Sequence, residues 1–168
     1  MLVRHSRDNL PAPMTITIGS KAPPFTLPSG PGSPVDVGAL LGREKIVLLF
    51  VPFAFSSLCT AAVCHLRDEW SRWDALGCTV FVVSVDSPFA VAKWRECDRI
   101  PFPVLSDFNK DVSRSYGALH EDLKGLKGFA KRSAFVIDAT GVVRYASVNE
   151  DPSVQVDFAA IEQAVKSC

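Results

Sequence analysis

The order of apolar and polar positions along the chain predicts alternating strands and helices. Residues 44–53 (EKIVLLFVPF) and 78–86 (CTVFVVSVD) are short, rich in β-branched residues and apolar on both faces, which is typical of buried central strands. Between them, a helical period over residues 58–76 predicts a helix that ends at Gly77. The apolar residues that carry this period are Val63, Leu66, Trp70 and Trp73.

Shorter segments complete the order. In chain order we expect a short strand and an extended proline-rich segment over 14–28, a loop over 29–42, a helix over 88–98, a strand over 102–107, one or two helical turns over 110–119, a hairpin over 133–148 and an amphipathic helix over 153–168. This succession predicts an α/β fold with a central mixed β-sheet flanked by helices on both faces. A length of 168 residues fits one domain over 16–168, after a flexible extension over 1–15 in which Met14 is an alternative start.

Composition and charge exclude several classes of partner. Apolar residues make up 48% of the chain, and 18 basic residues balance 18 acidic ones, so no net charge favours nucleic acid or an anionic membrane. The longest apolar run, residues 46–55, contains a proline and is half the length of a membrane span, which needs about twenty residues. The N-terminus lacks the apolar stretch of a secretory signal. We therefore expect a cytoplasmic protein that binds neither nucleic acid nor membrane.

The chain has five cysteines, and an odd number in a reducing compartment argues against a structural disulfide framework. Cys59 stands where a buried strand gives way to a helix. Because the first amide groups of a helix lack partners and the helix dipole favours an anion there, this position favours a thiolate, which is a nucleophile. The alternative is that Cys59 is a small buried apolar residue, as most free cysteines are.

The motif P-x-x-x-S-x-x-C, formed by Pro52, Ser56 and Cys59, resembles the active-site signature of the peroxiredoxins, peroxidases with a thioredoxin-like fold. Further segments that resemble this family are IGSKAPPFTLP, FPVLSD, YGAL and KRSAFVID, so the resemblance covers about residues 17–165. It implies that Cys59 is the peroxidatic thiolate, that Pro52 limits access of water and that Ser56 hydrogen-bonds the thiolate or the peroxide. It also implies that Arg132 supplies a fixed positive charge, which stabilises charge moving from sulfur to oxygen.

One position departs from the family pattern. Many peroxiredoxins have a glutamate three residues after the peroxidatic cysteine, and this chain has Ala62. The hydrogen bonds that this glutamate would make near the active site are therefore not predicted for this chain.

A second cysteine, Cys64, follows Cys59 by five residues, a spacing that resembles the Q-type (bacterioferritin comigratory) peroxiredoxins, whose resolving cysteine lies in the same helix. In an intact helix two such Cα atoms are about 8 to 9 Å apart, too far for a disulfide. A Cys59–Cys64 bond therefore requires the first turns to unwind. Cys64 could instead serve packing. The chain also resembles the E-type alkyl hydroperoxide reductases, in which case an external low-molecular-weight or glutaredoxin-like thiol would reduce the sulfenic acid.

The resemblance implies a peroxide substrate, a thioredoxin-like, glutaredoxin-like or low-molecular-weight thiol as reductant, and no cofactor or metal; a homodimer stays open. Three other functions are alternatives, and the sequence argues against the first two. A disulfide carrier would need C-x-x-C, which is absent, and a metal site at Cys59, Cys64 and His65 would lack a fourth ligand. A redox sensor that relays oxidation to a partner would use the same thiolate.

Other residues have weaker expectations. His65 is expected on the helix surface and His120 in an exposed loop, while His5 lies in the N-terminal extension. Packing or incidental exposure is expected for Cys78, Cys97 and Cys168. Five aromatic residues are candidates either for a peroxide pocket or dimer interface, or for the core: Phe53, Phe55, Phe89, Trp94 and Phe129.

Overall fold

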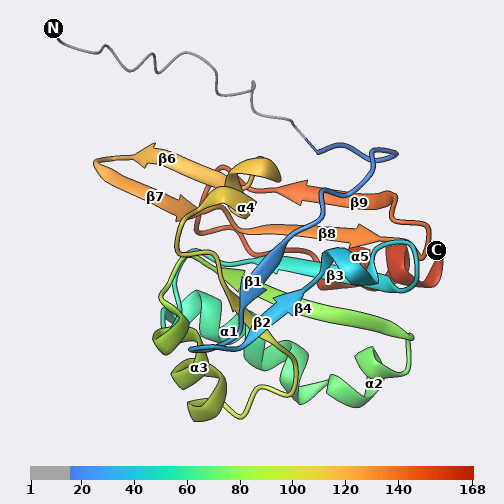
Figure 1. Cartoon of the computed structure of the whole chain (residues 1–168), viewed down its shortest axis with the longest axis horizontal. Coiled ribbons are helices and arrows are strands. Elements are labelled where there is room, and N and C mark those ends of the chain that lie inside the picture. Colours follow the sequence, from blue (N-terminus) through green and yellow to red (C-terminus); the bar gives the residue numbers. More distant parts are fainter. Residues whose placement is uncertain (1–15) are drawn as a thin grey trace, which may run out of the picture.

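The structure, a computed structural model, describes residues 16–168. The extension predicted over residues 1–15, with Met14 and His5, lies outside them. The central sheet has the order β5-β4-β3-β8-β9 (Figure 1). Strands β3 (Lys45–Phe50), β4 (Cys78–Ser84) and β5 (Val104–Ser106) run parallel, and β8 (Ser133–Ile137) and β9 (Val143–Val148) add two antiparallel strands. The predicted mixed sheet and the hairpin over 133–148 are confirmed.

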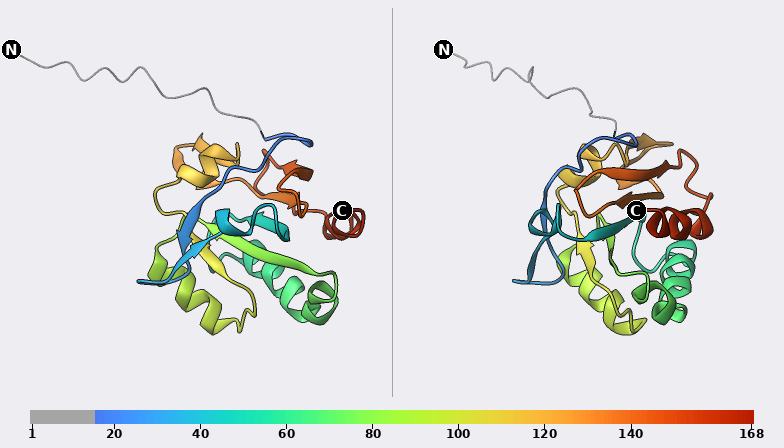
Figure 2. Two further views of the ribbon diagram at one scale, coloured as in Figure 1. Left: turned by 45° about the vertical axis from the view of Figure 1, so that its right-hand side comes forward. Right: turned by 90° about the vertical axis from the view of Figure 1, so that its right-hand side faces the viewer.

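Both faces of the sheet are covered, because successive side chains of a strand point to opposite faces. On β3, Val47 and Leu49 pack against one apolar cluster, and Ile46 and Leu48 pack against the other. The first cluster includes α1 (Ser57–Asp68), α2 (Trp70–Asp74), α3 (Pro88–Cys97) and α5 (Phe158–Lys166). The second includes α4 (Asp111–Ser115) and the N-terminal described segment. The two rotated views show this layering (Figure 2).

The single helix predicted over residues 58–76 is wrong. Helix α1 ends at Asp68, and α2 begins at Trp70 after a break at Glu69, where φ is −103° and ψ is 18°. The apolar period did not reveal this break because Leu66 and Trp73, on either side of it, are buried in the same cluster.

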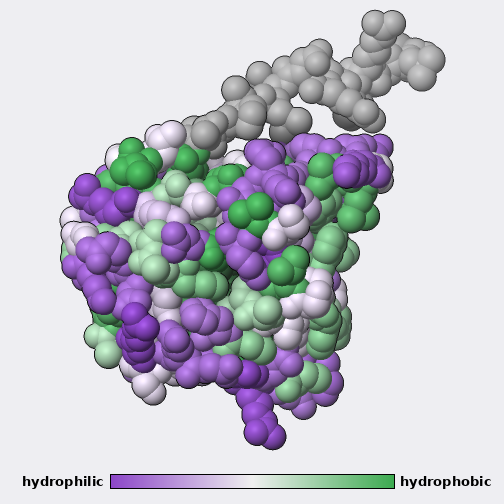
Figure 3. Space-filling model, turned by 180° about the vertical axis from the view of Figure 1, so that it is seen from behind, coloured by the Kyte–Doolittle hydropathy of each residue, from purple (hydrophilic) through white to green (hydrophobic). Residues whose placement is uncertain are grey.

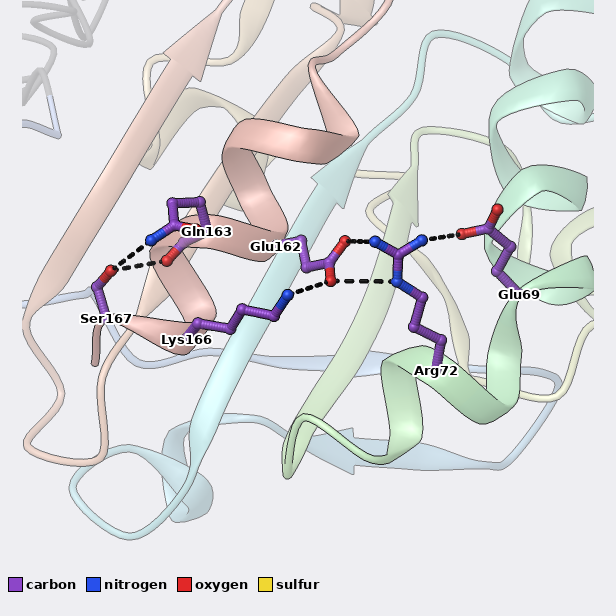
Figure 4. Close-up of polar contacts among 6 residues, drawn as sticks. All are labelled: Glu69, Arg72, Glu162, Gln163, Lys166 and Ser167. Atoms are coloured by element: carbon purple, nitrogen blue, oxygen red, sulfur yellow. Dashed lines mark hydrogen bonds and ion pairs between the residues drawn. The ribbon is translucent and has the colours of Figure 1, made fainter.

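Ion pairs join α2 to α5 beyond this break. Arg72 contacts Glu69 at 3.3 Å and Glu162 at 2.6 Å, and Lys166 contacts Glu162 at 2.7 Å (Figure 4). The carboxylate of Glu162 therefore accepts from side chains of two helices.

Two further predictions need correction. The strand expected at the start of residues 14–28 does not appear in its described part; the first strand is β1 (Thr26–Pro28), paired with β2 (Pro34–Asp36) inside the predicted loop. The expected loop around His120 is a hairpin of β6 (Leu119–Leu123) and β7 (Leu126–Ala130). Its turn residues Lys124 and Gly125 have φ of 52° and 87°, which matches the left-handed conformation of a two-residue hairpin turn.

The surface mixes residue types. Figure 3 shows hydrophobic and hydrophilic residues interspersed on the face opposite to that of Figure 1. Among residues 16–168, no helix combines the length and the apolar character needed to cross a bilayer. The same part of the chain contains no group of three or more His, Cys, Asp or Glu side chains placed to hold a metal ion.

Candidate active site

The loop from β3 to α1 is fixed by Asp86, which follows β4. Its carboxylate Oδ2 accepts from the backbone N–H of Ala54 at 2.7 Å and also from the hydroxyl of Ser84. The hydroxyl of Ser106, at the end of β5, donates to the backbone oxygen of Asp86 at 2.5 Å. The loop before the candidate nucleophile is therefore held against the carboxyl ends of β4 and β5.

Helix α1 begins without a side-chain cap. Ser56 occupies the N-cap position, but its hydroxyl donates to the backbone oxygen of Phe53 at 3.1 Å, and no side-chain cap bond is formed. The first turn also lacks an acidic residue. Amide groups at the start of α1, where Cys59 is the third helical residue, thus remain able to stabilise an anion.

The Cys59 side chain is fully buried, in the apolar cluster between α1 and the sheet that also contains Val51 and Val63. Leu58, the residue before it, is exposed and lines a pocket at the surface beside this turn. The thiol is free. Cys59 therefore lies in the turn that borders the pocket, with its side chain directed into the core.

A pocket of about 560 Å³ opens at this turn. It brings Arg132 together with Pro52 and Ser56, which precede it by at least 76 positions in the sequence. Much of the remaining wall is apolar: Phe53 and Phe129 stack with ring centroids 5.1 Å apart, and the other apolar wall residues are Leu58, Leu123, Leu126 and Pro152. Three of the five predicted site residues thus line one pocket beside the turn that carries Cys59.

Arg132 precedes β8 and is only 4% exposed. Its Nε donates to the backbone oxygen of Pro152 at 2.6 Å, and its own backbone oxygen accepts from the N–H of Asn149 at 3.0 Å. Its Nη1 is buried and has no hydrogen-bond partner among residues 16–168. An unpaired donor on a permanently charged group is the feature that an oxyanion or a peroxide oxygen would satisfy.

The Ala62 position lies beside this arginine. Ala62, Val63, Arg132 and Gln155 line a second, very small cavity of about 10 Å³. A larger side chain at position 62 would extend into a cavity that Arg132 also lines. In this chain Arg132 is instead held through the carbonyl of Pro152.

Cys64 does not reach the pocket. It is half-buried on α1, which is uninterrupted from Ser57 to Asp68, and its thiol is free. Burial raises the pKa of the Cys64 thiol, while the charge of Arg67 opposes this shift. In the intact helix Cys64 is therefore kept as a neutral thiol and is separated from Cys59.

The histidines divide between surface and core. His65 is exposed as predicted, and its ring lies 4.6 Å from that of Phe158. The exposed loop expected for His120 is wrong: the residue is buried in β6, with its ring 4.8 Å from that of Phe129. Burial, together with the charge of Lys131, lowers the pKa of His120. A neutral imidazole is the consequence.

The aromatic candidates and remaining cysteines also divide. Phe55 and Phe89 are exposed, Phe53 is half-buried, and Trp94 and Phe129 belong to the core. Cys97 is exposed, whereas burial raises the pKa of Cys78 to about 11. Burial also raises the pKa of Cys168.

Sequence reasoning missed the hairpin that walls the pocket. Leu123 and Leu126 flank the Lys124–Gly125 turn and line the pocket from β6 and β7. The available signal was a turn dipeptide containing glycine between two apolar residues, a hairpin pattern. Residues 150–152, which also line the pocket, lie after β9 in a segment where no site residue was expected from the sequence.

Known proteins resemble this chain in sequence and in fold. The model of the AhpC/TSA family matches residues 18–146. A putative bacterioferritin comigratory peroxiredoxin of Coxiella burnetii is 35% identical, with 86% of this chain and 93% of the relative covered. Alkyl hydroperoxide reductase E of Mycobacterium bovis is 30% identical, covering 83% and 90%. The crystal structure of peroxidoxin BcpB from Mycobacterium tuberculosis superposes with a TM-score of 0.75 at 28% identity, over 89% of this chain and 94% of the other. The chain therefore belongs to the AhpC/TSA family and is a peroxiredoxin, a thiol-dependent peroxidase with a thioredoxin-like fold.

Proposed function

We propose that Cys59 is the peroxidatic cysteine and that Pro52, Ser56 and Arg132 form the peroxide site around it. The observation that carries this proposal is their convergence: the three residues line one pocket, at the helical turn that contains Cys59. Arg132 lines this pocket, and its Nη1 is buried and unpaired within residues 16–168. Pro52 is buried at the pocket wall, which limits the water that reaches the sulfur.

The first step transfers oxygen to sulfur. The Cys59 thiolate attacks the terminal oxygen of a hydroperoxide, the S–O bond forms as the O–O bond breaks, and the departing alkoxide or hydroxide takes up a proton. The products are a sulfenic acid on Cys59 and an alcohol or water. Because negative charge moves from sulfur to the leaving oxygen, the Arg132 guanidinium and the first-turn amides stabilise the transition state more than the ground state.

The second step forms a disulfide. The Cys64 sulfur attacks the Cys59 sulfenic acid, an S–S bond replaces the S–O bond, and water leaves. Since α1 is intact in this structure, its first turns must unwind before the two sulfurs meet. Ser57 and Thr60 in these turns have low helix propensity, which supports such a change. A thioredoxin-like or glutaredoxin-like dithiol then returns the disulfide to two thiols.

The pocket supports organic hydroperoxides as substrates beside hydrogen peroxide. Its apolar wall of Leu58, Leu123, Leu126 and stacked Phe53 and Phe129 offers burial to an alkyl chain. Exposed Phe55 and Phe89 are candidates for a homodimer contact, which size measurement in solution tests. We place this activity in the cytoplasm, where free thiols persist.

Stopped-flow tryptophan fluorescence tests the assignment, because Trp94 lies in the same buried cluster as Cys59. Rapid oxidation by peroxide should be lost in Cys59→Ser and kept in Cys97→Ser, a matched change at an exposed cysteine. A rate equal to that of a free thiol would overturn the proposal. Sustained peroxide consumption with a dithiol donor separates an enzyme from a redox sensor.

Mass spectrometry of the oxidised protein decides how the sulfenic acid is resolved. A Cys59–Cys64 disulfide is expected under mild peroxide, and it should be absent in Cys64→Ser. If wild type instead accumulates a sulfenic acid that an added thiol removes, the one-cysteine cycle with an external thiol holds, which is the second candidate.

A further inference from the structure

Gln155 contacts the turn that contains the nucleophile. It lies in the segment between β9 and α5, and its side-chain Nε2 donates to the backbone oxygen of Leu58 at 2.7 Å. Leu58 directly precedes Cys59 in the first turn of α1. A side chain 97 residues away along the chain is thus bound to the backbone beside Cys59.

The same segment also contacts Arg132. Pro152, three residues before Gln155, accepts from Arg132 Nε at 2.6 Å. Gln155 itself lines the small cavity shared by Ala62 and Arg132. Residues 152–155 therefore touch both the charged group of the pocket and the helical turn that carries the thiol, and they fix one relative to the other.

We propose that Gln155 is a positioning residue that holds the first turn of α1 in its helical form, and that its hydrogen bond to Leu58 must break before Cys59 and Cys64 join. The proposal rests on the roles of Cys59 and Cys64 given above. The role of Gln155 is separate from the roles of the two cysteines, because one side chain from outside the helix stabilises the helical turn.

Unwinding of the first turns of α1 would move the backbone group that Gln155 binds. A disulfide between Cys59 and Cys64 requires backbone changes in the first turns of α1, and the Leu58 carbonyl lies within that region. A bond made only in the helical form shifts the equilibrium between helical and unwound forms toward the helical one. The net contribution of one such hydrogen bond corresponds to about a fivefold change in this equilibrium.

Loss of the Gln155 hydrogen bond should therefore have opposite effects on the oxidation of Cys59 and on the formation of the disulfide. The helical form keeps Cys59 in the first turn of α1, next to the pocket that Arg132 lines, so losing the bond should slow oxidation by peroxide. The unwound form is the one that closes the disulfide, so losing the bond should speed the second step. General destabilisation predicts no such opposed pair of changes.

Gln155→Ala is the test variant, and Gln163→Ala is its matched control. Gln163 is the other glutamine of the chain and its side chain contacts Ser167 within α5 (Figure 4). Gln155→Glu adds a variant of nearly the same size whose carboxylate cannot donate to Leu58. Two measurements are made on the full chain: amide hydrogen exchange of the reduced protein, and stopped-flow rates of oxidation and of disulfide formation.

In Gln155→Ala and Gln155→Glu, exchange at Thr60, Ala61 and Ala62 should rise about three- to tenfold over wild type and Gln163→Ala. Disulfide formation should accelerate by a similar factor. Oxidation should slow by a smaller factor, because the helical form stays the major one. If exchange and both rates match those of Gln163→Ala, the proposal is overturned, even where Cys59 and Cys64 prove to be the reacting pair. If wild type does not react through Cys59, the function proposed above fails, and hydrogen exchange alone still decides the role of Gln155.

Discussion

Arg132 and Pro152 are joined by a 2.6 Å hydrogen bond from the guanidinium Nε to a backbone carbonyl. A carboxylate partner would neutralise part of the positive charge of an arginine. A backbone carbonyl is uncharged, so it orients the guanidinium without neutralising it. Arg132 Nη1 stays unpaired within residues 16–168. This arginine is therefore anchored by a carbonyl and not by a carboxylate, in keeping with the apolar Ala62 at the cavity that both residues line.

Arg132→Lys should lower the second-order rate constant of oxidation by peroxide about 10²- to 10³-fold. The ammonium keeps the charge but lacks the planar fork that binds Pro152 and the pocket together, and the loss of one well-placed donor has this magnitude. Stopped-flow fluorescence measures it. Arg43→Lys is the control, because it makes the same change at an exposed arginine that does not line the pocket. Equal loss in both variants would contradict the role given to Arg132.

Disulfide formation should accelerate as pH rises from about 7 to 9. Burial raises the pKa of Cys64 in the helical form, so that form favours the neutral thiol and is fully stabilised below the ordinary cysteine pKa of about 8.5. Above it, deprotonation favours exposure of Cys64, which unwinds the helix and supplies the attacking thiolate. Quenched-flow alkylation with mass spectrometry follows this step. A flat profile over this range would show that Cys64 is not the titrating nucleophile.

Leu126→Asn should weaken reaction with long-chain organic hydroperoxides and leave reaction with hydrogen peroxide unchanged. Leu126 lines the pocket and is 53% exposed, so the change removes an apolar contact with little effect on folding. Losing apolar burial on the order of 1 kcal/mol corresponds to about a fivefold effect. Ile18→Asn, at an exposed position outside the pocket, serves as control. Parallel loss for both peroxides would refute an alkyl-binding wall.

Asp138→Asn should destabilise the fold by about 1 to 3 kcal/mol, the range for a broken charged hydrogen-bond set. The carboxylate of Asp138 accepts from Thr140 N at 2.8 Å, from Val142 N at 3.0 Å and from Arg144 Nε at 2.5 Å, and so fixes the β8–β9 turn.

The same residue predicts a pH dependence. Burial raises the pKa of Asp138, but hydrogen bonds from Thr140, Val142 and Arg144 outweigh it and hold the pKa well below its usual range. The stabilisation is therefore present above the unfolded value of about 3.9 and is lost as pH falls below it. Urea unfolding at pH 7 and pH 3 measures the difference, which should shrink in Asp138→Asn. An unchanged difference would assign the acid sensitivity to other carboxylates.

Sequence patterns predicted the elements that the core dictates. The buried strands at β3 and β4 carry apolar residues on both faces, and the helix at α3 has Pro88 in its first turn with Ser87 as its cap. The convergence of Pro52 and Ser56 beside the Cys59 turn also follows from local order, because all three lie within eight positions of one strand-to-helix connection.

Long-range contacts account for what the sequence did not predict. Nothing in the local pattern places Gln155 against Leu58, or Pro152 against Arg132. These pairs form only when the segment after β9 packs against α1 and against the start of β8. Likewise, the burial of His120 depends on pairing with Phe129 across the β6–β7 hairpin. The break at Glu69 was hidden because the apolar stripe continues through it.

The break at Glu69 separates α1 from α2, and contacts on both sides of it limit how much of the chain would move if α1 unwound. On its far side, Arg72 ties α2 to Glu162 of α5. Just before it, Arg67 Nη1 donates to the backbone oxygen of Asp98 at 2.7 Å, beyond the end of α3. The carboxyl-terminal end of α1 is thus hydrogen-bonded to the segment after α3, while its first turn is hydrogen-bonded by the Gln155 side chain. We therefore expect the proposed unwinding to stay at the cysteine end of α1, before the break at Glu69 and before Trp73 of α2.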